Sequence, residues 1–595
     1  MSNQLALTLI LACGIAAQFI AWRLKLPSIL LLLIAGFILG PATGWMNPDA
    51  LFGEFLFPAV GMAVGVILFE GGLSLKIREF KATSGVVQGL VSVGILVTWV
   101  LASLLAHFTL DLSWSLALLL GAILTVTGPT VVIPMLMLIR PKGRVNTIVK
   151  WEGILNDPIG ALLAVLVYEA IIATNFESAT TVLLSGFPIT LVVGVVGGLV
   201  TGWVVAQAIR HHWVPEFLTN TFTLSMVIGL YTVSNMIQHE SGLFSVTVMG
   251  IYLGNQKKVS IRNLVGFKED LRVLLISSLF IILAARMRPE DLAHISVGSF
   301  VFLLLLILAV RPAAVYLSTL RSDMPFNEKL FVSMLAPRGI VAAAVTSLFA
   351  SQLIQLGVEG AEKLVPNMFF IIVGTILIYG LSARPLAKKL DLADEDPQGC
   401  VILGSNLFSR TLAKALQSEK IPVLIVDAQW SAIKAARMEG IPTLLGNVLS
   451  DKVTQTIDYT GMGRFLALTP NLELNSLACI RFGDIFGLKE VYQLGEPQDK
   501  DKPTQWIPED LSGHTLFGPH MSFAYITKRL HHGATIKRTP ITKDFSYEQF
   551  RAQYADQEAA PLCLISESGK LTFFTVAKSI TPRPGQVLIS LVGGV

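Results

Sequence analysis

Charged residues are scarce in this sequence. Asp, Glu, Lys and Arg make up 14% of the 595 residues and hydrophobic residues 53%, whereas about a quarter of a typical soluble domain is charged. The mean hydropathy is +0.65, which excludes a chain that folds entirely in water. The scarcity is uneven, since charges are sparse up to about residue 390 and ordinary beyond residue 394. We therefore expect a membrane part followed by a water-soluble part.

Cysteine is also rare, and strongly basic segments are missing. The four cysteines share no short metal-type spacing and are too few for a disulfide framework, so we expect buried thiols. A net charge of +4 without an arginine-rich patch argues against a nucleic-acid partner. The first apolar run has no basic residue before it and no small-residue cleavage site, which indicates a retained helix rather than a signal peptide.

Long apolar runs are abundant in the first part. A bilayer core about 30 Å thick needs about 20 apolar residues as helix. About thirteen runs are of that order: 4–22, 27–46, 55–74, 86–108, 113–139, 148–173, 184–209, 217–238, 241–255, 271–287, 294–318, 327–354 and 366–387. The pattern predicts a multi-pass α-helical membrane domain over residues 1–390.

The loops between these runs alternate in charge. Every second loop is rich in Lys and Arg, as around Lys76 and Arg144, while the loops between them carry mainly Asp and Glu. The positive-inside rule places the basic loops in the cytoplasm. With thirteen spans, the N-terminus is then periplasmic and the C-terminal part cytoplasmic.

Ionisable residues within the runs are few and informative, because each costs about 2.5 to 3.5 kcal/mol at the centre of a membrane helix. They are Glu70, Glu152, Asp157, Arg286, Arg311 and Arg338. Glu152 and Asn156 share one helix face, and Asp157 lies about 100° further round, so these groups can converge on one cavity. A structural ion pair is the alternative interpretation for the charged residues, and it is the stronger one for Arg286 and Arg311.

Two runs contain Gly and Pro near their middle. T-V-T-G-P-T at residues 125–130 and A-P-R-G-I at residues 336–340 each lose a backbone donor and permit non-helical angles, so we expect two broken helices. Broken spans at corresponding places in two halves point to a transporter binding site. The fifth and twelfth runs correspond if the fold consists of two six-span inverted repeats, and the broken helices then cross.

An ion site follows from these positions. Unwound backbone at Thr127 and the Asp157 carboxylate offer hard oxygen ligands to a dehydrated Na+, K+ or Li+ ion, and Glu152 and Arg338 can compensate the free helix ends. Desolvation raises the pKa of a carboxyl in a dry cavity, so protons compete with the cation for one group. Such competition predicts cation/proton antiport, with neither enzyme activity nor a transport cofactor.

Several ordered segments resemble the Na+/H+ exchanger class of cation/proton antiporters, in particular its bacterial NhaP-type branch. They are I-L-F-E-G-G-L (67–73), T-G-P-T (127–130), E-G-I-L-N-D-P (152–158), F-K-E-D-L-R (267–272), R-P (311–312) and A-P-R-G-I-V-A-A-A-V (336–345). The resemblance covers nearly all of the first 390 residues. It implies a thirteen-helix inverted-repeat fold, a homodimer with elevator-like movement, a bacterial inner membrane and electroneutral exchange.

The resemblance also assigns roles to residues. It implies that the Asn156-Asp157 pair marks the ion site, with Asp157 carrying either cation or proton, and that Glu152 and Arg338 form a stabilising ion pair. Many relatives have Asp and Ser at the two positions where this chain has glycine, 128 and 153. Because oxygen ligands are fewer here, the choice between Na+ and K+ stays open.

Beyond residue 397 the pattern changes to alternating strands and helices. The apolar segment G-C-V-I-L, a turn at Gly404, and an acid about 20 residues later at the end of the next strand describe a Rossmann-like nucleotide site. We predict this α/β domain over residues 398–500. Its candidate ligand residues are Gly404, Ser405, Asn406, Asp427, Gly446, Asn447 and Asn475.

The turn keeps only the first of three fingerprint glycines, and the Asn406 side chain obstructs a pyrophosphate. The segment resembles the RCK/TrkA-type domains that regulate K+ channels and transporters, which implies that Asp427 holds a ribose. AMP, ATP and NAD(H) are the candidate ligands, and a degenerate scaffold without a ligand is the alternative. A polar linker at residues 495–503 leads to residues 508–595, which resemble the small C-terminal subdomain of these regulators, with paired strands around Ser568 and Gly569.

Three functions compete for the whole chain. The leading one is an antiporter of Na+ or K+ against H+, regulated by a nucleotide at the cytoplasmic domain. A glutathione-gated K+ efflux channel shares such a core and regulator, but the Asn156-Asp157 pair and Arg338 argue against it. A membrane-tethered nicotinamide oxidoreductase ranks last, because no catalytic His, Cys or Tyr constellation accompanies the Gly404 turn.

Overall fold

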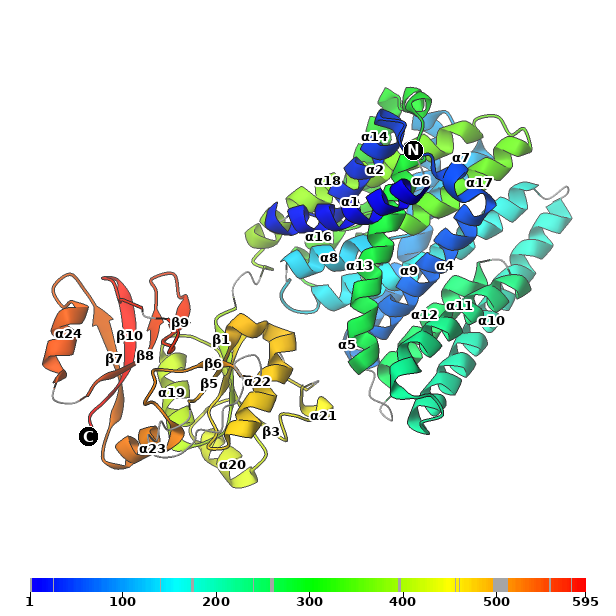
Figure 1. Cartoon of the computed structure of the whole chain (residues 1–595). Helices are drawn as coiled ribbons and strands as arrows, with labels where there is room; N and C mark the ends of the chain where they lie inside the picture. The colour runs from blue at the N-terminus through cyan, green and yellow to red at the C-terminus, as the bar shows by residue number, and fades with distance from the viewer. Residues whose placement is uncertain are drawn as a thin grey trace. The chain divides into compact units, whose positions relative to one another are not determined.

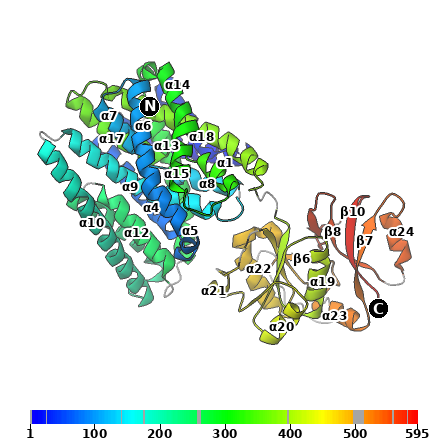
Figure 2. The same ribbon diagram turned by 180° about the vertical axis from the view of Figure 1, so that it is seen from behind.

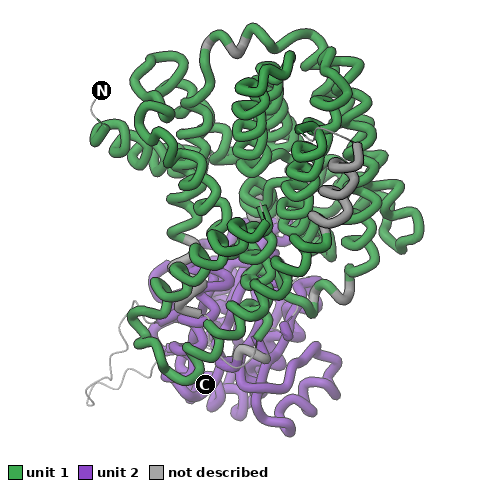
Figure 3. Tube along the Cα trace, turned by 90° about the vertical axis from the view of Figure 1, so that its right-hand side faces the viewer, with its two compact units in different colours: residues 1–393 green, residues 394–595 purple. Residues whose placement is uncertain are grey.

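A computed structural model describes residues 3–24, 26–139, 141–172, 176–238, 240–256, 262–393, 397–454, 456–457, 459, 461–495, 512–555, 558–578 and 580–594. The chain divides into two compact units, Met1–Ala393 and Asp394–Val595 (Figure 3). Nearly all of the predicted linker at residues 495–503 lies outside the described residues. So do the side chains at 267–269 in the F-K-E-D-L-R segment.

The first unit is a helical bundle (Figure 1). Its α-helices are α1 (Asn3–Leu24), α2 (Ser28–Phe37), α3 (Pro48–Phe52), α4 (Leu56–Leu73), α5 (Ile77–Gly89), α6 (Ile95–Leu110), α7 (Trp114–Ile123), α8 (Pro129–Ile139), α9 (Val145–Ile172), α10 (Phe176–Arg210), α11 (Thr219–Ile237), α12 (Ser241–Asn255), α13 (Arg262–Ala285), α14 (Val297–Leu305), α15 (Arg311–Ser318), α16 (Phe326–Ser333), α17 (Ile340–Gln355) and α18 (Leu364–Lys389). Within the described residues, eight helical stretches are long and apolar enough to cross a membrane, and Ser28–Ala42, Trp114–Ile123 and Ile340–Gln355 are shorter apolar helices.

Each predicted run contains helix, which confirms the multi-pass helical fold. The fifth run holds two helices, α7 and α8, and the twelfth holds α16 and α17. The observed helices extend beyond several runs, as in α10, because a helix continues into polar residues where its backbone hydrogen bonds are already formed. The run predicted at 86–108 belongs to a longer helical stretch from Ile77 to Leu110.

In the part of the first unit that the structure describes, three helical stretches contain π-helical segments: η1 (Ile38–Ala42), η3 (Leu90–Gly94) and η6 (Leu306–Val310). A π-turn accommodates one residue more than an α-turn. The η6 segment runs directly into α15, whose first residue is Arg311. It therefore sets the direction in which the Arg311 side chain leaves the helix.

Close helix contacts in this unit rely on small residues. α10, α11 and α12 run side by side (Figure 1; seen from behind in Figure 2), and α12 packs directly on α4. A Cβ atom at Gly250 would lie 2.3 Å from the Phe69 carbonyl oxygen, and one at Gly72 would lie 2.6 Å from that of Thr247. Membrane helices approach this closely where side chains are small.

The second unit contains a six-stranded parallel sheet in the order β3-β2-β1-β4-β5-β6. Its strands are β1 (Gly399–Leu403), β2 (Val423–Asp427), β3 (Thr443–Leu445), β4 (Met462–Ala467), β5 (Val491–Gln493) and β6 (His514–Thr515), and its helices include α19 (Leu407–Ser418), α20 (Trp430–Met438), α21 (Asp451–Thr454) and α22 (Leu472–Phe486). Alternate residues of β1 face opposite sides: Cys400 joins the cluster with α19 and α20, and Val401 joins that with α22. This two-faced arrangement is the predicted Rossmann-like fold.

A smaller antiparallel sheet follows in the order β7-β10-β8-β9. It comprises β7 (Thr535–Ile541), β8 (Ala560–Ile565), β9 (Leu571–Phe573) and β10 (Gln586–Val592), with α23 (Phe523–His531) and α24 (Tyr547–Gln553). β8 and β9 pair on either side of Ser568 and Gly569. Its apolar face shares a core with the α19 side of the parallel sheet.

Candidate functional site

The two broken helices cross at a pair of glycines. A Cβ atom at Gly128 would lie 2.6 Å from the Gly339 Cα atom, and one at Gly339 would lie 2.7 Å from the Gly128 Cα atom. The chain is not helical at residues 126–128, between α7 and α8, or at residues 335–339, between α16 and α17. The predicted breaks are therefore present, and they touch each other.

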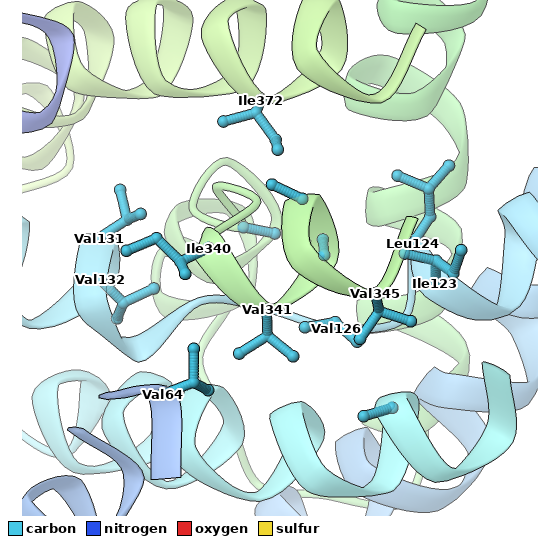
Figure 4. Packing of buried hydrophobic residues seen from close by; sticks show 14 of the residues in the cluster. Val64, Ile123, Leu124, Val126, Val131, Val132, Ile340, Val341, Val345 and Ile372 are labelled. Carbon is cyan, nitrogen blue, oxygen red and sulfur yellow. The ribbon is translucent and has the colours of Figure 1, made fainter. Parts of the chain in front are cut away.

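Apolar side chains on both sides of the crossing exclude water from its surroundings. Figure 4 shows this packing, which unites residues of α4, α7, α8, α17 and α18. The labelled residues are Val64, Ile123, Leu124, Val126, Val131, Val132, Ile340, Val341, Val345 and Ile372. Charges and carbonyl dipoles in such a dry environment act more strongly than in water.

One face of α9 lies against the first break and carries Asp157. A Cβ atom at Gly153 would lie 3.7 Å from the Thr127 carbonyl oxygen, and one at Gly160 would lie 2.6 Å from Thr125 Oγ1. Asp157 is four residues after Gly153 and three before Gly160, so all three share this face. The structure therefore places Asp157 on the face of α9 that lies against the unwound backbone at Thr127.

Several buried oxygen atoms around this crossing have no hydrogen-bond partner. They are both carboxylate oxygens of Asp157, Asn156 Oδ1, Thr127 Oγ1 and Thr130 Oγ1. Asp157 is 1% exposed and Asn156 4%. Buried oxygens without a partner carry a large desolvation cost, which a dehydrated cation or a proton would relieve.

The Glu152 carboxylate is held by Arg311 and not by Arg338, which corrects the ion pair implied by the family resemblance. Arg311 binds Glu152 in bidentate fashion, with an ion pair from Nη1 and a hydrogen bond of 2.9 Å from Nη2, and also donates to the Val332 carbonyl at 3.1 Å. Val332 lies in the last turn of α16. Arg311 thus fastens α9 to the half-helix that precedes the second break.

Arg338 instead caps the crossing. Its Nη1 donates to the Val126 carbonyl at 3.0 Å and its backbone N–H to Thr375 Oγ1 at 3.3 Å. The side chain is 2% exposed and lies close enough to interact electrostatically with Asp157 and with Tyr379 of α18. Neither Thr375 nor Tyr379 stands out in the sequence, because only the fold brings α18 beside the second break.

Glu70 lies apart from this group. At the end of α4 it forms an ion pair of 3.1 Å with Arg272 of α13. Both residues line a cavity of about 30 Å³ between α4, α11 and α13, together with Asn220 and Thr223. Arg286 pairs with Asp49 at 2.8 Å and covers the Phe57 ring.

The Rossmann turn and the acidic end of β2 also come together. The Ser405 N–H donates to Asp427 Oδ2 at 2.7 Å, and the Gln429 N–H donates to Asp427 Oδ1 at 2.8 Å. The Gly446 N–H bonds to the Asp427 carbonyl at 2.8 Å. Gly404, Ser405, Asp427 and Gly446 therefore form one corner at the carboxyl end of the sheet, where nucleotides bind in such folds.

The hydrogen-bonding groups at the start of α19 are already bonded to other groups of the protein. Asn406 caps the helix by accepting from the Ser409 N–H at 3.0 Å, and its amide donates to the Leu468 carbonyl at 2.7 Å. The Asn406 N–H in turn donates to Ser409 Oγ at 2.8 Å. A pyrophosphate does not fit these occupied donors, whereas a ribose beside Asp427 is compatible with the corner.

The remaining predicted nucleotide residues are engaged elsewhere. Asn447 Oδ1 accepts from the Leu449 N–H at 2.9 Å within its own turn. Asn475 is fully buried and bonds to Thr469 at 2.6 Å and 3.0 Å. It therefore shapes the loop after β4 instead of facing a ligand.

Comparison with known proteins agrees with this architecture. A model of the sodium/hydrogen exchanger transmembrane domain matches residues 7–389, which is more than half of the chain. The chain belongs to the sodium/hydrogen exchanger family. A TrkA-N domain model matches residues 400–498, so this exchanger-family chain carries a TrkA-N domain after its membrane part.

Curated relatives have low sequence identity to this chain but align with most of its length. The K(+)/H(+) antiporter NhaP2 of Shewanella sp. (strain ANA-3) is 25% identical over 64% of this chain and 65% of its own length. The Na(+)/H(+) antiporter 1 of Methanocaldococcus jannaschii is 26% identical over 73% of this chain and 95% of its own length. The chain thus spans just under two thirds of the length of the NhaP2 relatives that it matches.

A solved structure shares the fold. The sodium proton antiporter MjNhaP1 from Methanocaldococcus jannaschii, determined at pH 8, aligns with a TM-score of 0.57 and 23% identity over 65% of this chain and 98% of its own. At this identity the likeness concerns the fold of the helical unit.

Proposed function

We propose that this protein is a secondary antiporter that exchanges a monovalent cation for H+, with Asp157 binding the two in turn. The observation that carries the proposal is the pair of buried Asp157 oxygens without hydrogen-bond partners at the crossing of two broken helices. Family membership, and relatives named K(+)/H(+) antiporter and Na(+)/H(+) antiporter, support the same activity.

The chemistry of the site explains why one ion must replace the other. A carboxylate without partners in a dry cavity is costly when charged. A dehydrated cation held by Asp157, Asn156 and Thr127 neutralises this charge, and so does a proton on the same carboxyl. The empty charged site is the unfavourable state, so one ion leaves as the other arrives and the exchange is electroneutral.

The other buried charges near the crossing are compensated without a direct bond to Asp157. Glu152 is neutralised by Arg311, which leaves Arg338 as the cation nearest to the Asp157 carboxyl. Arg338 holds the broken backbone at Val126 through its hydrogen bond. We assign Glu152 and Arg311 to positioning of α9, and Arg338 to stabilisation of the crossing.

The wider setting follows from the sequence and the family. We propose a homodimer in a bacterial inner membrane, with the N-terminus periplasmic and the second unit cytoplasmic, since the basic loops then face inward. Both K+ and Na+ remain candidate substrates. The glycines at 128 and 153 leave the site with two side-chain oxygens fewer than many relatives have, so we assume no preference for Na+.

For regulation we propose an adenine nucleotide at the corner formed by Asp427 and the Gly404 turn. The carboxylate at the end of β2 supports ribose recognition. Because Asn406 fills the phosphate-facing side, AMP, which has a single phosphate, is favoured over ATP and NAD(H), whose linked phosphates would cross the capped turn.

The decisive experiment measures cation-driven dissipation of a pH gradient in proteoliposomes, for Na+, K+ and Li+, with and without a voltage clamp. We expect the wild type to exchange independently of voltage and the Asp157→Asn variant to be inactive while folding normally. Ser277→Ala, a buried substitution in α13 whose hydroxyl accepts from Gln18 of α1, serves as a control. Normal exchange by Asp157→Asn contradicts the proposal, and voltage-dependent cation flow without proton movement identifies a channel instead.

A further inference from the structure

The exit from the helical unit is tied to the helices that form the ion site. Residues 390–393, which follow α18, return to the loop between α8 and α9. The Lys142 N–H donates to the Leu392 carbonyl at 2.7 Å, and Pro141 and Ala393 form an antiparallel bridge. Lys142 Nζ also pairs with Asp391 at 3.0 Å. We call residues 141–144 together with residues 390–393 the exit tether.

The tether continues into the first turn of α16. Arg144 pairs with Glu328 at 3.1 Å and donates to the Asp323 carbonyl at 2.7 Å. Gly143 has a positive φ of 69° and would place a Cβ atom 3.6 Å from Glu328 Oε1. A glycine is needed at such a φ, so the loop is shaped to lie against α16.

Two short rods lead from the tether to the crossing. α9 begins at Val145 and reaches Asp157 after twelve residues, about 18 Å at 1.5 Å per residue. α16 begins at Phe326 and ends at Ser333, about 12 Å long, and its last turn is held by Arg311. Helices of this length move as rigid bodies, so a shift of the tether reaches both sides of the ion site.

We propose that the exit tether couples the second unit to the ion site, so that the position of residues 390–393 sets the exchange rate. This inference rests on the proposed antiport, which supplies the readout. The covalent order of the chain supports it, because residues 394–398 follow the tether in the sequence and precede the strand β1 of the TrkA-N domain. Interactions among backbone groups carry most of the coupling, since the exposed Lys142 pair contributes little by itself.

The geometry of the tether is tested independently of transport. The full chain with Pro141→Cys and Ala393→Cys should form a disulfide, because directly opposed residues of an antiparallel bridge lie within reach of one. Burial raises the pKa of Cys400 and Cys479 to about 12, so they stay unreactive, and Cys13→Ala removes the half-buried cysteine. Each single variant serves as a control, and absence of the bond under oxidation overturns the tether.

The coupling is tested by cutting the same path in two places. One full-chain variant receives ten Gly and Ser residues after residue 393, and another carries Arg144→Gln with Glu328→Gln. We expect each to change the exchange rate by about threefold or more, and the combination to match either one alone. Arg286→Gln with Asp49→Asn, an ion pair of similar length elsewhere in the unit, should leave the rate unchanged.

The outcomes separate the two proposals. If the wild type shows no exchange in any cation, the proposed function fails, although the disulfide still reports the tether. If the wild type exchanges but the insertion and the Arg144 variant have no effect, or their effects multiply independently, the coupling is refuted while antiport stands.

Discussion

Replacing Gly128 by alanine would place a methyl carbon at the point where the two broken helices touch. The added Cβ would lie 2.6 Å from Gly339 Cα and 3.0 Å from Gly339 N. Carbon atoms pack at about 3.5 to 4.0 Å, so the two breaks must part by roughly 1 Å. Both neighbours are backbone atoms, which cannot rotate away as a side chain would.

The cost has two parts. Overpacking a dense core costs about 1 to 3 kcal/mol, which lowers the thermal midpoint in detergent without unfolding the chain. Parting the breaks by about 1 Å moves Thr127 away from Asp157, and ion coordination tolerates only about 0.2 Å. We therefore expect a fall in exchange rate of about 100-fold, much larger than the loss of stability implies.

A matched set of glycines provides the controls. Gly153→Ala adds a methyl group on the same site but only at ordinary contact, 3.7 Å from the Thr127 carbonyl, and a Cβ at Gly229 meets nothing within 4 Å. Both variants should exchange at close to the wild-type rate in the proteoliposome assay. Equal activity of Gly128→Ala and Gly229→Ala would refute the close crossing.

Three further predictions concern charges and the nucleotide corner. Arg311→Met leaves the Glu152 charge buried without its partner and should destabilise the protein by about 3 to 5 kcal/mol in detergent unfolding, and adding Glu152→Gln should restore much of the loss; an unchanged midpoint in the single variant would contradict the ion pair. Asn406→Gly opens the capped turn at a cost of a few tenths of a kcal/mol and should strengthen NADH binding in calorimetric titration, whereas equal binding would show that the cap is no obstacle. Partial burial raises the pKa of Glu439, but hydrogen bonds from Lys414 and Arg410 leave it below its usual value of 4.5. Because the folded pKa is lowered, Glu439→Gln should reduce the thermal midpoint at pH 7, and this difference should shrink below pH 4.5 and be lost once the pH falls through the lowered pKa. A difference that persists below that pKa would exclude the charge as its cause.

Local sequence patterns predict much of the helical unit. Apolar run lengths locate the helices, and Gly128 with Pro129 indicates the break because both residues oppose helix formation at their own positions. Helical spacing alone places Asp157 near the face of Glu152 and Asn156, about 100° further round. These properties depend on residues near one another in the chain.

Partner choice across the fold is less predictable. Glu152 and Arg311 are 159 residues apart, and both Arg311 and Arg338 are arginines within apolar runs, so neither spacing nor composition decides which one binds the carboxylate. The R-P segment marks Arg311 but not its partner. In the same way, Asn475 is of a residue type that often binds ligands, yet its side-chain oxygen accepts a hydrogen bond from Thr469 of the preceding loop.

The η6 segment shows that the phase of a helix can decide a charge pair. If Leu306–Val310 kept the same residues but wound as an ordinary α-helix, the wide turn would be lost, and everything before it would rotate by roughly 100° relative to α15. Either Arg311 would swing away from Glu152 or α14 would turn its lipid-facing side inward. Loss of this one wide turn would thereby release α9 from α16 without removing any functional group.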